Sequence, residues 1–201
     1  MKITGNEDSV IYSDRSTVKL IGGGLTLNVS GMNNKIYVGK NVRFSGLTIN
    51  INSSNNSIYI EDDCTLAGVF IIKIKDGAEI HFGSGTTVGG ANLICGEGRK
   101  IKFGKDCMIA WNIEIRTTDS HAIFDAHTNE RINFGDDVIV GDHVWIGAHA
   151  TILKGAKIPS GSVVALKSLV LDKFEENNVV IAGVPARVVK KNIRWTRELL
   201  G

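Results

Sequence analysis

Apolar residues recur at every sixth position through the C-terminal half of the chain. The series runs Phe134, Val140, Ile146, Ile152, Ile158, Val164 and Val170. Small or apolar residues follow most of these anchors by four positions: Val138, Val144, Ala150, Ala156, Ser162 and Ser168. A helix repeats about every 3.6 residues and a strand every two, so neither element alone gives this period. Two inward positions in every six predict short strands joined by tight corners and stacked as a solenoid.

The N-terminal half carries the same pattern as groups of anchors, one anchor for each of three faces. They are Val38 and Phe44, then Ile60, Leu66 and Ile72, then Phe82, Val88 and Ile94, then Phe103, Ile109 and Ile115. The last three groups are followed by steps of ten, nine and nineteen residues, against six in the C-terminal array, so the extra residues fall at one corner. A 22-residue repeat, in which residues 24–28 (GLTLN) match 46–50 (GLTIN), extends the solenoid toward the N-terminus. Asn50 stands where an apolar anchor is expected, with Ile49 and Ile51 beside it, so the register there can slip by one residue.

Length and composition agree with a single domain. The chain has 201 residues with 23 Gly and only 2 Pro, which suits many tight corners in a paired sheet. We expect one solenoid over residues 1–201, with a protruding loop at about 116–133 and a C-terminal cap at about 172–201. The N-terminus lacks a basic-then-apolar signal, and no apolar run approaches the roughly 18 residues of a membrane span, which predicts a cytoplasmic location.

The three cysteines show no metal-ligand spacing and no disulfide framework. Cys64 and Cys107 stand four positions after anchors, so we expect them in the core. Cys95 follows the anchor Ile94 and is therefore expected to point outward.

The C-terminal segment changes character. Residues 172–178 are typical of a loop, 179–182 of a last strand and 183–185 of a turn. The spacing of Val188, Val189, Ile193, Leu199 and Leu200 predicts an amphipathic helix over about 186–200 that covers the open end of the solenoid. From residue 150 onward the chain has nine Lys or Arg and four Asp or Glu, a net charge of +5, so the residues before it carry a net charge of −3. A basic end suits a phosphate-bearing ligand, although a solvated tail explains it equally well, and the lack of interleaved aromatic residues disfavours nucleic acid.

One histidine stands out among five. His121 lies inside the longest corner insertion, and a long excursion from a regular rod is where function tends to reside. His127 in the same loop is its main rival, whereas His81 is expected to face solvent. His143 and His149 occupy equivalent outward positions on different faces, which argues against an intrachain metal pair. An imidazole has an ordinary pKa near 6.5, so a histidine in such a loop is a candidate general base near neutral pH.

Residues 140–147 (VGDHVWIG) and 181–189 (IAGVPARVV), with the six-residue array between them, closely resemble the hexapeptide-repeat O-acetyltransferases. This family includes galactoside, maltose, xenobiotic and capsular polysaccharide acetyltransferases. The resemblance is strong from about Phe103 to the end and weaker before it. It implies an all-β, left-handed parallel β-helix that is usually a homotrimer with active sites between subunits and uses acetyl-CoA, without a metal. The left hand departs from the general right-handed rule for crossovers.

The resemblance also implies roles for individual residues. Residues 117–123 (TTDSHAI) look like the loop that carries the family's catalytic histidine, which makes His121 the base of a direct transfer without an acetyl-enzyme. Asp119 would orient the ring or tune its charge, unless it is simply solvated. Trp145 is expected to point outward, into the active-site wall or a subunit contact. The residues implied for acetyl-CoA are Ala148, Ala165, Leu166, Lys167, Arg187 and Lys190.

The acceptor is harder to infer from sequence. Residues 124–125 and 129–132 look most like enzymes that modify cell-surface polysaccharides, including sialic-acid capsules. This resemblance is compatible with peripheral association with a capsule assembly complex. A basic rim of Arg116, Arg131 and Lys154 would suit such an acceptor, although each is equally typical of a structural ion pair or a solvated charge. The alternatives are a small acceptor (simple sugar, antibiotic, serine or nucleotide sugar), a scaffold without activity, and a zinc carbonic anhydrase with three histidines between subunits.

Overall fold

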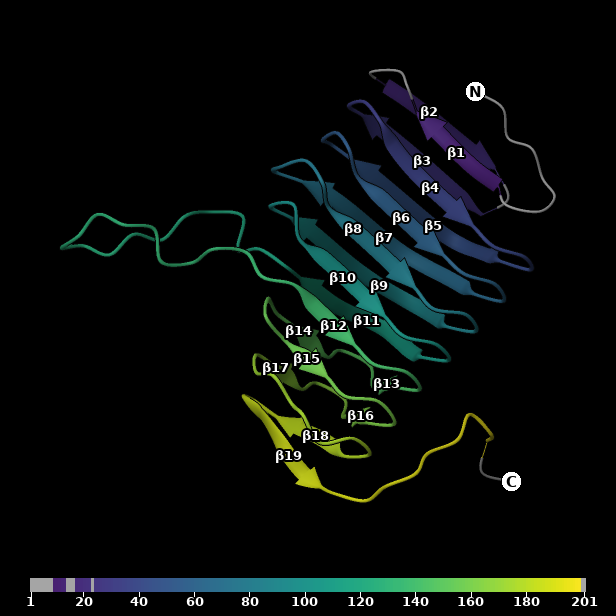
Figure 1. The fold of residues 1–201 in the computed structure, drawn as a ribbon. Helices are drawn as coiled ribbons and strands as arrows, with labels where there is room; N and C mark the ends of the chain where they lie inside the picture. The colour runs from purple at the N-terminus through teal and green to yellow at the C-terminus, as the bar shows by residue number, and fades with distance from the viewer. Residues whose placement is uncertain (1–8, 14–16, 23, 200–201) are drawn as a thin grey trace.

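The computed structural model describes residues 9–13, 17–22 and 24–199, and the regular elements of these ranges are all β-strands wound into a solenoid (Figure 1). One wall stacks short parallel strands, one for each coil. This first wall consists of β4 (Asn34–Val38), β6 (Ser57–Ile60), β8 (Glu79–Phe82), β10 (Lys100–Phe103), β12 (Val138–Val140) and β15 (Lys157–Ile158).

The other two walls share long strands that bend in the middle. These are β5 (Arg43–Ile51), β7 (Thr65–Lys73), β9 (Thr87–Gly96) and β11 (Met108–Arg116), whose pairing register shifts at the bend. In later coils the two halves are separate strands. The second wall continues through β13 (Trp145–Ile146), β16 (Val163–Val164) and β18 (Val180–Gly183), and the third begins at β3 (Leu25–Ser30) and continues through β14 (Thr151–Ile152) and β17 (Leu169–Val170).

Three edges run along this prism, and each has a different structure on it. The tail edge joins the first and second walls and includes Asp106 and His143. The groove edge joins the second and third walls and includes Ala148 and Lys167. The arm edge joins the third wall to the next coil of the first and includes the long insertion after β11, as the spacing of the anchors predicts (Figure 1).

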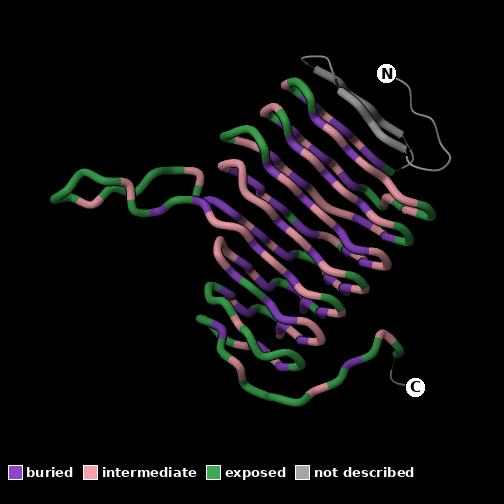
Figure 2. The backbone as a smooth tube through the Cα atoms, in the orientation of Figure 1, coloured by how far each residue is buried: buried purple, intermediate pink, exposed green. Residues whose placement is uncertain are grey.

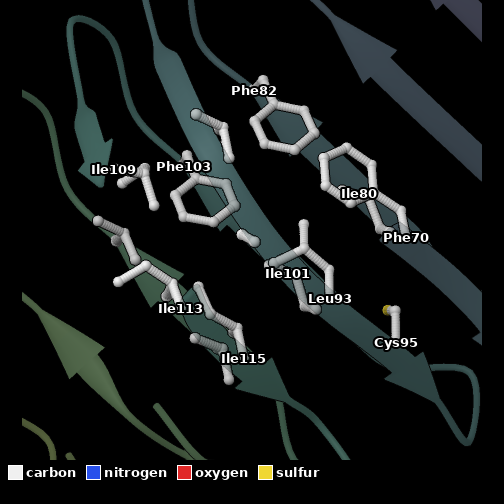
Figure 3. Packing of buried hydrophobic residues seen from close by; sticks show 14 of the residues in the cluster. Phe70, Ile80, Phe82, Leu93, Cys95, Ile101, Phe103, Ile109, Ile113 and Ile115 are labelled. Atoms are coloured by element: carbon white, nitrogen blue, oxygen red, sulfur yellow. The ribbon is translucent and has the colours of Figure 1, made fainter. Parts of the chain in front are cut away.

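The core fills the prism in layers. Phe70, Phe82 and Phe103 stack along the axis with ring centroids 5.3 and 5.0 Å apart (Figure 3). Figure 2 shows buried positions alternating with partly exposed ones along the walls. This alternation follows from a pleat that turns every second side chain inward.

The predicted anchor positions Ile94 and Asn50 are out of register, because each follows a bend at which its strand has one extra residue. In β9, Gly89 and Gly90 stand opposite the single residue Ala67 of β7. The extra residue reverses the pleat, so Cys95 is buried and Ile94 is only half-buried. The prediction that Cys95 points outward was therefore wrong.

The same kind of bulge in β5 explains the misfit at Asn50. Ile49 and Ile51 are buried, and Asn50 points outward, where its Oδ1 accepts a hydrogen bond of 2.9 Å from Asn28 Nδ2. The register does slip by one residue there.

Phe134 is also not a core anchor. It is 60% exposed, and its ring lies 4.9 Å from the guanidinium of Arg131. The reason is that the first wall resumes only at Val138, so Phe134 belongs to the returning part of the insertion.

Both ends of the solenoid are covered by antiparallel strands. At the N-terminal end β1 (Ser9–Ser13) pairs with β4, and β2 (Thr17–Gly22) pairs with β3. At the C-terminal end β19 (Ala186–Lys190) pairs with β18. The predicted C-terminal helix was wrong: the open edge of β18 offers a row of unpaired N–H and C=O groups, and β19 satisfies them. Within the described ranges there is no helix of the length and apolar character that crossing a bilayer requires.

Candidate functional site

The insertion forms an arm, defined as residues 117–137, that extends away from the arm edge (Figure 1). Its two halves run antiparallel, with an isolated bridge between Phe124 and Arg131 and a hydrogen bond of 2.9 Å from Ile132 N to Ile123 O. His121 lies in the outgoing half and is exposed. Its ring forms no hydrogen bond with the described residues, so a bound hydroxyl could reach it. Figure 2 shows that most of the arm beyond its base is exposed.

The base of the arm is built on Glu97, which belongs to the preceding coil. This carboxylate is only 5% exposed and accepts hydrogen bonds from Arg131 Nη2 at 2.9 Å, from Gly135 N at 3.3 Å and from Thr118 Oγ1. The Arg131 hydrogen bond is the main cause that holds the pKa of Glu97 at about 2, against the opposing effect of burial. The carboxylate therefore ties both halves of the arm to the solenoid.

Asn133 connects the two halves of the arm closer to His121. Its Nδ2 donates to the carbonyl of His121 and to Asp119 Oδ2, each at 2.8 Å, and its Oδ1 accepts from Ile123 N at 2.7 Å. Lys154 Nζ hydrogen-bonds to Asp119 Oδ2 and, at 3.2 Å, to the Asn133 carbonyl. The Lys154 ammonium is the main reason why the pKa of Asp119 lies below its ordinary value. Asp119 thus faces Lys154 and Asn133, and it forms no hydrogen bond with the His121 ring.

The three basic residues predicted for the acceptor gather at the arm edge. Arg131 and Lys154 are engaged by Glu97 and Asp119, as described above. Arg116 Nη1 lies 3.4 Å from Glu114, and its Nε is buried without a hydrogen-bond partner in the described part of the chain. The same holds for Ser120 Oγ, next to His121. Unsatisfied polar groups of this kind are uncommon in native structures and are often found where function requires them.

Four of the six residues predicted for acetyl-CoA lie on the groove edge: Ala148, Ala165, Leu166 and Lys167. Lys167 N donates to the carbonyl of Ala148 at 3.0 Å, so the two residues are neighbours in successive coils. Leu166 is largely exposed and Ala165 is half-buried. A side chain at Gly147 would lie 2.7 Å from Leu166 N, so only glycine lets these coils approach so closely. One coil further, β19 carries Arg187 and Lys190, and Arg187 Nη1 bonds Asp172 at 2.6 Å.

Trp145 points outward from the second wall, as the alternation predicts, while Ile146 beside it is buried. Its ring lies against the C-terminal tail, because the centroid of Trp195 is 6.1 Å away. Trp195 is 9% exposed, stacks on His143 at 4.0 Å and donates its indole N–H to the His143 carbonyl at 2.9 Å. His143 Nδ1 lies 2.6 Å from Asp106 Oδ2.

Sequence reasoning missed Glu97, Asn133 and Trp195. The first two carried a weak signal, since they stand in the corner before the insertion and at its return. Trp195 carried none once residues 186–200 were assigned to a helix. His143 and His149 lie on the tail and groove edges respectively, which agrees with their predicted divergence. Among the residues that the structure describes, no three His, Cys, Asp or Glu side chains cluster in a way that could hold a metal ion.

Comparison with known proteins gives a consistent answer. The chain is 40% identical over 173 residues to the polysialic acid O-acetyltransferase of Neisseria meningitidis, covering 86% of this chain and 80% of that protein. It is 33% identical over 121 residues to the polysialic acid O-acetyltransferase of Escherichia coli O1:K1, covering 60% of this chain and 39% of that protein. No protein-family model matches the sequence.

Solved structures agree with the sequence relatives. The polysialic acid O-acetyltransferase OatWY superposes with a TM-score of 0.85 at 39% identity, covering 88% of this chain and 83% of that one. The polySia-specific acetyltransferase NeuO superposes with a TM-score of 0.81 at 31% identity, covering 87% and 79%. These matches identify the protein as an O-acetyltransferase. Within that class, the chain belongs to the family of polysialic acid O-acetyltransferases.

Proposed function

We propose that this protein transfers an acetyl group from acetyl-CoA to a hydroxyl of a sialic-acid-containing capsular polysaccharide, with His121 as general base. The observation that carries the proposal is that His121 is exposed, that its ring forms no hydrogen bond with the described residues, and that it lies near the base of an arm that Glu97 ties to the solenoid. The acceptor class is taken from the polysialic acid O-acetyltransferases to which the chain is related.

The proposed reaction is a direct transfer. A sugar hydroxyl attacks the thioester carbonyl while the His121 ring takes the hydroxyl proton, and a tetrahedral oxyanion forms. A tetrahedral oxyanion of this kind is stabilised by backbone N–H donors. When the C–S bond breaks, the electron pair stays on sulfur, and the imidazolium returns its proton to the CoA thiolate.

We place the pantetheine arm of acetyl-CoA along the groove edge. Ala148 and Ala165 are small enough for close approach, Leu166 offers an exposed apolar side chain, and Lys167 lies beside them. Arg187 and Lys190 lie one coil further, where they can meet phosphate groups. The three basic residues of the arm edge, Arg116, Arg131 and Lys154, would meet the acidic sugar.

The arm and the groove lie on different edges of the prism, which favours a site built by two subunits. Apolar side chains of the arm support this arrangement, because Ile123, Phe124 and Ile132 are all more than half exposed. Exposed apolar side chains that gather on one segment are typical of a surface covered by a partner. A homotrimer, in which the arm of one protomer reaches the groove of the next, satisfies both observations.

The test incubates the protein with acetyl-CoA and a panel of bacterial polysaccharides and small acceptors, and detects O-acetyl esters by mass spectrometry. We expect transfer to polysialic acid. The His121→Ala variant should lose about 10²- to 10⁴-fold in kcat while it still binds acetyl-CoA. Transfer to antibiotics or simple sugars alone would refute the proposed acceptor, and full activity of His121→Ala would refute the proposed base.

A further inference from the structure

The amide of Asn133 uses all its hydrogen-bonding capacity within the arm. The side chain is 8% exposed and offers two N–H donors and two acceptor positions. Both donors are used, on Asp119 Oδ2 and on the His121 carbonyl. The acceptor oxygen meets Ile123 N at 2.7 Å and Arg131 Nε at 3.4 Å. No other side chain in the described part of the structure hydrogen-bonds to the backbone of His121.

These contacts reach the outgoing half of the arm at residues 119, 121 and 123, on both sides of the histidine and at the histidine itself. None of them reaches the imidazole. We propose that Asn133 is a positioning residue, which fixes the backbone of His121 so that the ring meets the acceptor hydroxyl in a productive geometry. The proposal rests on the proposed function, in which His121 is the base.

The position of Asn133 is in turn set by the solenoid. Its backbone carbonyl accepts hydrogen bonds from Arg131 Nη2 at 3.1 Å and from Lys154 Nζ at 3.2 Å. Arg131 is held by the buried Glu97, and Lys154 belongs to the following coil. The arm therefore has a continuous polar connection from two coils of the solenoid to the residue that carries the base.

An amide is required at this position. A carboxylate of the same shape keeps the acceptor that meets Ile123 and Arg131. In place of the donor nitrogen, however, it sets an oxygen against the His121 carbonyl and the Asp119 carboxylate. Three oxygens without a proton between them repel one another, so the segment at His121 moves while the base of the arm stays in place.

The test variant is therefore Asn133→Asp, with Asn177→Asp as its matched control. Asn177 is exposed in the loop before β18, so the control makes the same change of charge away from the arm. Four properties are measured on the full chain with polysialic acid and acetyl-CoA: kcat, the KM for acetyl-CoA, the pH dependence of kcat, and the midpoint of thermal unfolding. A displacement of about 1 Å at a reacting group can cost about 10²-fold in rate.

We expect Asn133→Asp to lower kcat by about 10- to 100-fold and to leave the KM for acetyl-CoA and the unfolding midpoint unchanged. The kcat profile of Asn133→Asp should still rise with pH, because His121 is still the base, whereas the profile of His121→Ala should lack this rise. In the His121→Ala background, Asn133→Asp should cause no further loss, since a residue that acts only through the histidine has nothing left to position.

Three outcomes separate the possibilities. An unchanged kcat in Asn133→Asp would overturn the inference. A lower kcat together with a lower midpoint of thermal unfolding would also overturn it, because the residue would then have a general structural role. An additional loss in the His121→Ala background would also overturn it, because Asn133 would then act independently of the histidine. If His121→Ala is itself fully active, the proposed function fails, and that result is visible without the Asn133 variant.

Discussion

Glu97 is the residue on which the attachment of the arm depends most. Its carboxylate is nearly inaccessible and accepts three hydrogen bonds, all from the arm: one from Thr118, which precedes His121, and two from Arg131 and Gly135, which follow it. Such a group is stabilising only while it is ionised. Its pKa falls from an ordinary value of 4.5 to about 2 in the folded protein.

This shift gives a prediction with a defined sign. A carboxyl with a lowered pKa contributes stability that is fully present above its unfolded pKa and is lost as the pH falls through the folded value. We expect the free energy of unfolding of the wild-type protein to fall between about pH 4.5 and pH 2. Glu97→Gln should be less stable than the wild type at pH 7, and its free energy of unfolding should change less with pH across that window. Urea unfolding at a series of pH values measures both effects. The exposed Glu175→Gln is the control and should follow the wild type, whereas a wild-type slope in Glu97→Gln would contradict the assignment.

At the residue scale, most inward positions were predictable because the six-residue period fixes the side of the pleat. The exceptions have a common physical cause. Cys95 and Asn50 follow bends at which one strand has one residue more than its neighbour, and a single extra residue reverses the facing of the side chains that follow. The misfit at Asn50 reveals the bulge in β5, whereas the bulge before Cys95 leaves no sign in the period, because Ile94 is apolar and fits the anchor pattern.

At the element scale, the C-terminal tail is the part of the fold that sequence patterns describe least well. After β19 it turns back along the tail edge, where Ile193 N bonds the carbonyl of Asn178 at 2.9 Å. Beyond Trp195, Arg197 donates to Asp106 Oδ1 at 2.6 Å and to the carbonyls of Cys107 and Gly85 at 2.7 and 3.2 Å. The tail therefore ties several successive coils together.

The fastening of the tail can be tested with two arginines three residues apart. Arg197→Ala removes a cation that hydrogen-bonds to several coils, and we expect it to lower the free energy of unfolding by about 2 kcal/mol. Arg194 is exposed and forms no hydrogen bond or ion pair in the described structure, so Arg194→Ala should change nothing measurable. Urea unfolding followed by tryptophan fluorescence gives both values. Equal stability of the two variants would show that Arg197 does not fasten the tail to the solenoid.

The apolar spacing of residues 188–200 is compatible with a helix, and tertiary structure overrode it. Val188 and Val189 are β-branched, which favours a strand, and β18 presents an open edge at the end of the solenoid. Pairing with that edge satisfies backbone groups that a separate helix would leave exposed on β18. Trp195 and Arg197 then find their partners on the tail edge, at sequence separations of 52 and 91 residues from His143 and Asp106.

At the scale of the whole molecule, the decisive feature is that arm and groove lie on different edges of one prism. If active sites form between protomers, then two inactive variants can complement each other. His121→Ala removes the base from the arm, and Ala165→Trp fills the groove with a large side chain. In any trimer that contains both variants, one site of the three combines an unaltered arm with an unaltered groove.

We therefore expect each single variant to be inactive and mixed trimers to recover about a third of the wild-type rate. Co-expression with two different affinity tags and purification on both isolates the mixed trimers, and the rate is measured with acetyl-CoA and polysialic acid. Mixed trimers of His121→Ala with tagged His121→Ala serve as the control. An absence of recovery would mean that arm and groove of the same protomer form the site.

The sequence by itself determined the three-sided solenoid, the corner that holds the long insertion, and the histidine within it, because all of these follow from the period of the apolar residues and its interruptions. Only the tertiary structure decided what surrounds that histidine. Glu97 meets Arg131 across 34 residues and Lys154 meets Asp119 across 35, and such contacts depend on which coils stack at the arm edge. The same holds for the bulges and for the tail. A repeating pattern specifies which way a side chain faces, whereas the partner it finds there depends on how neighbouring coils are aligned.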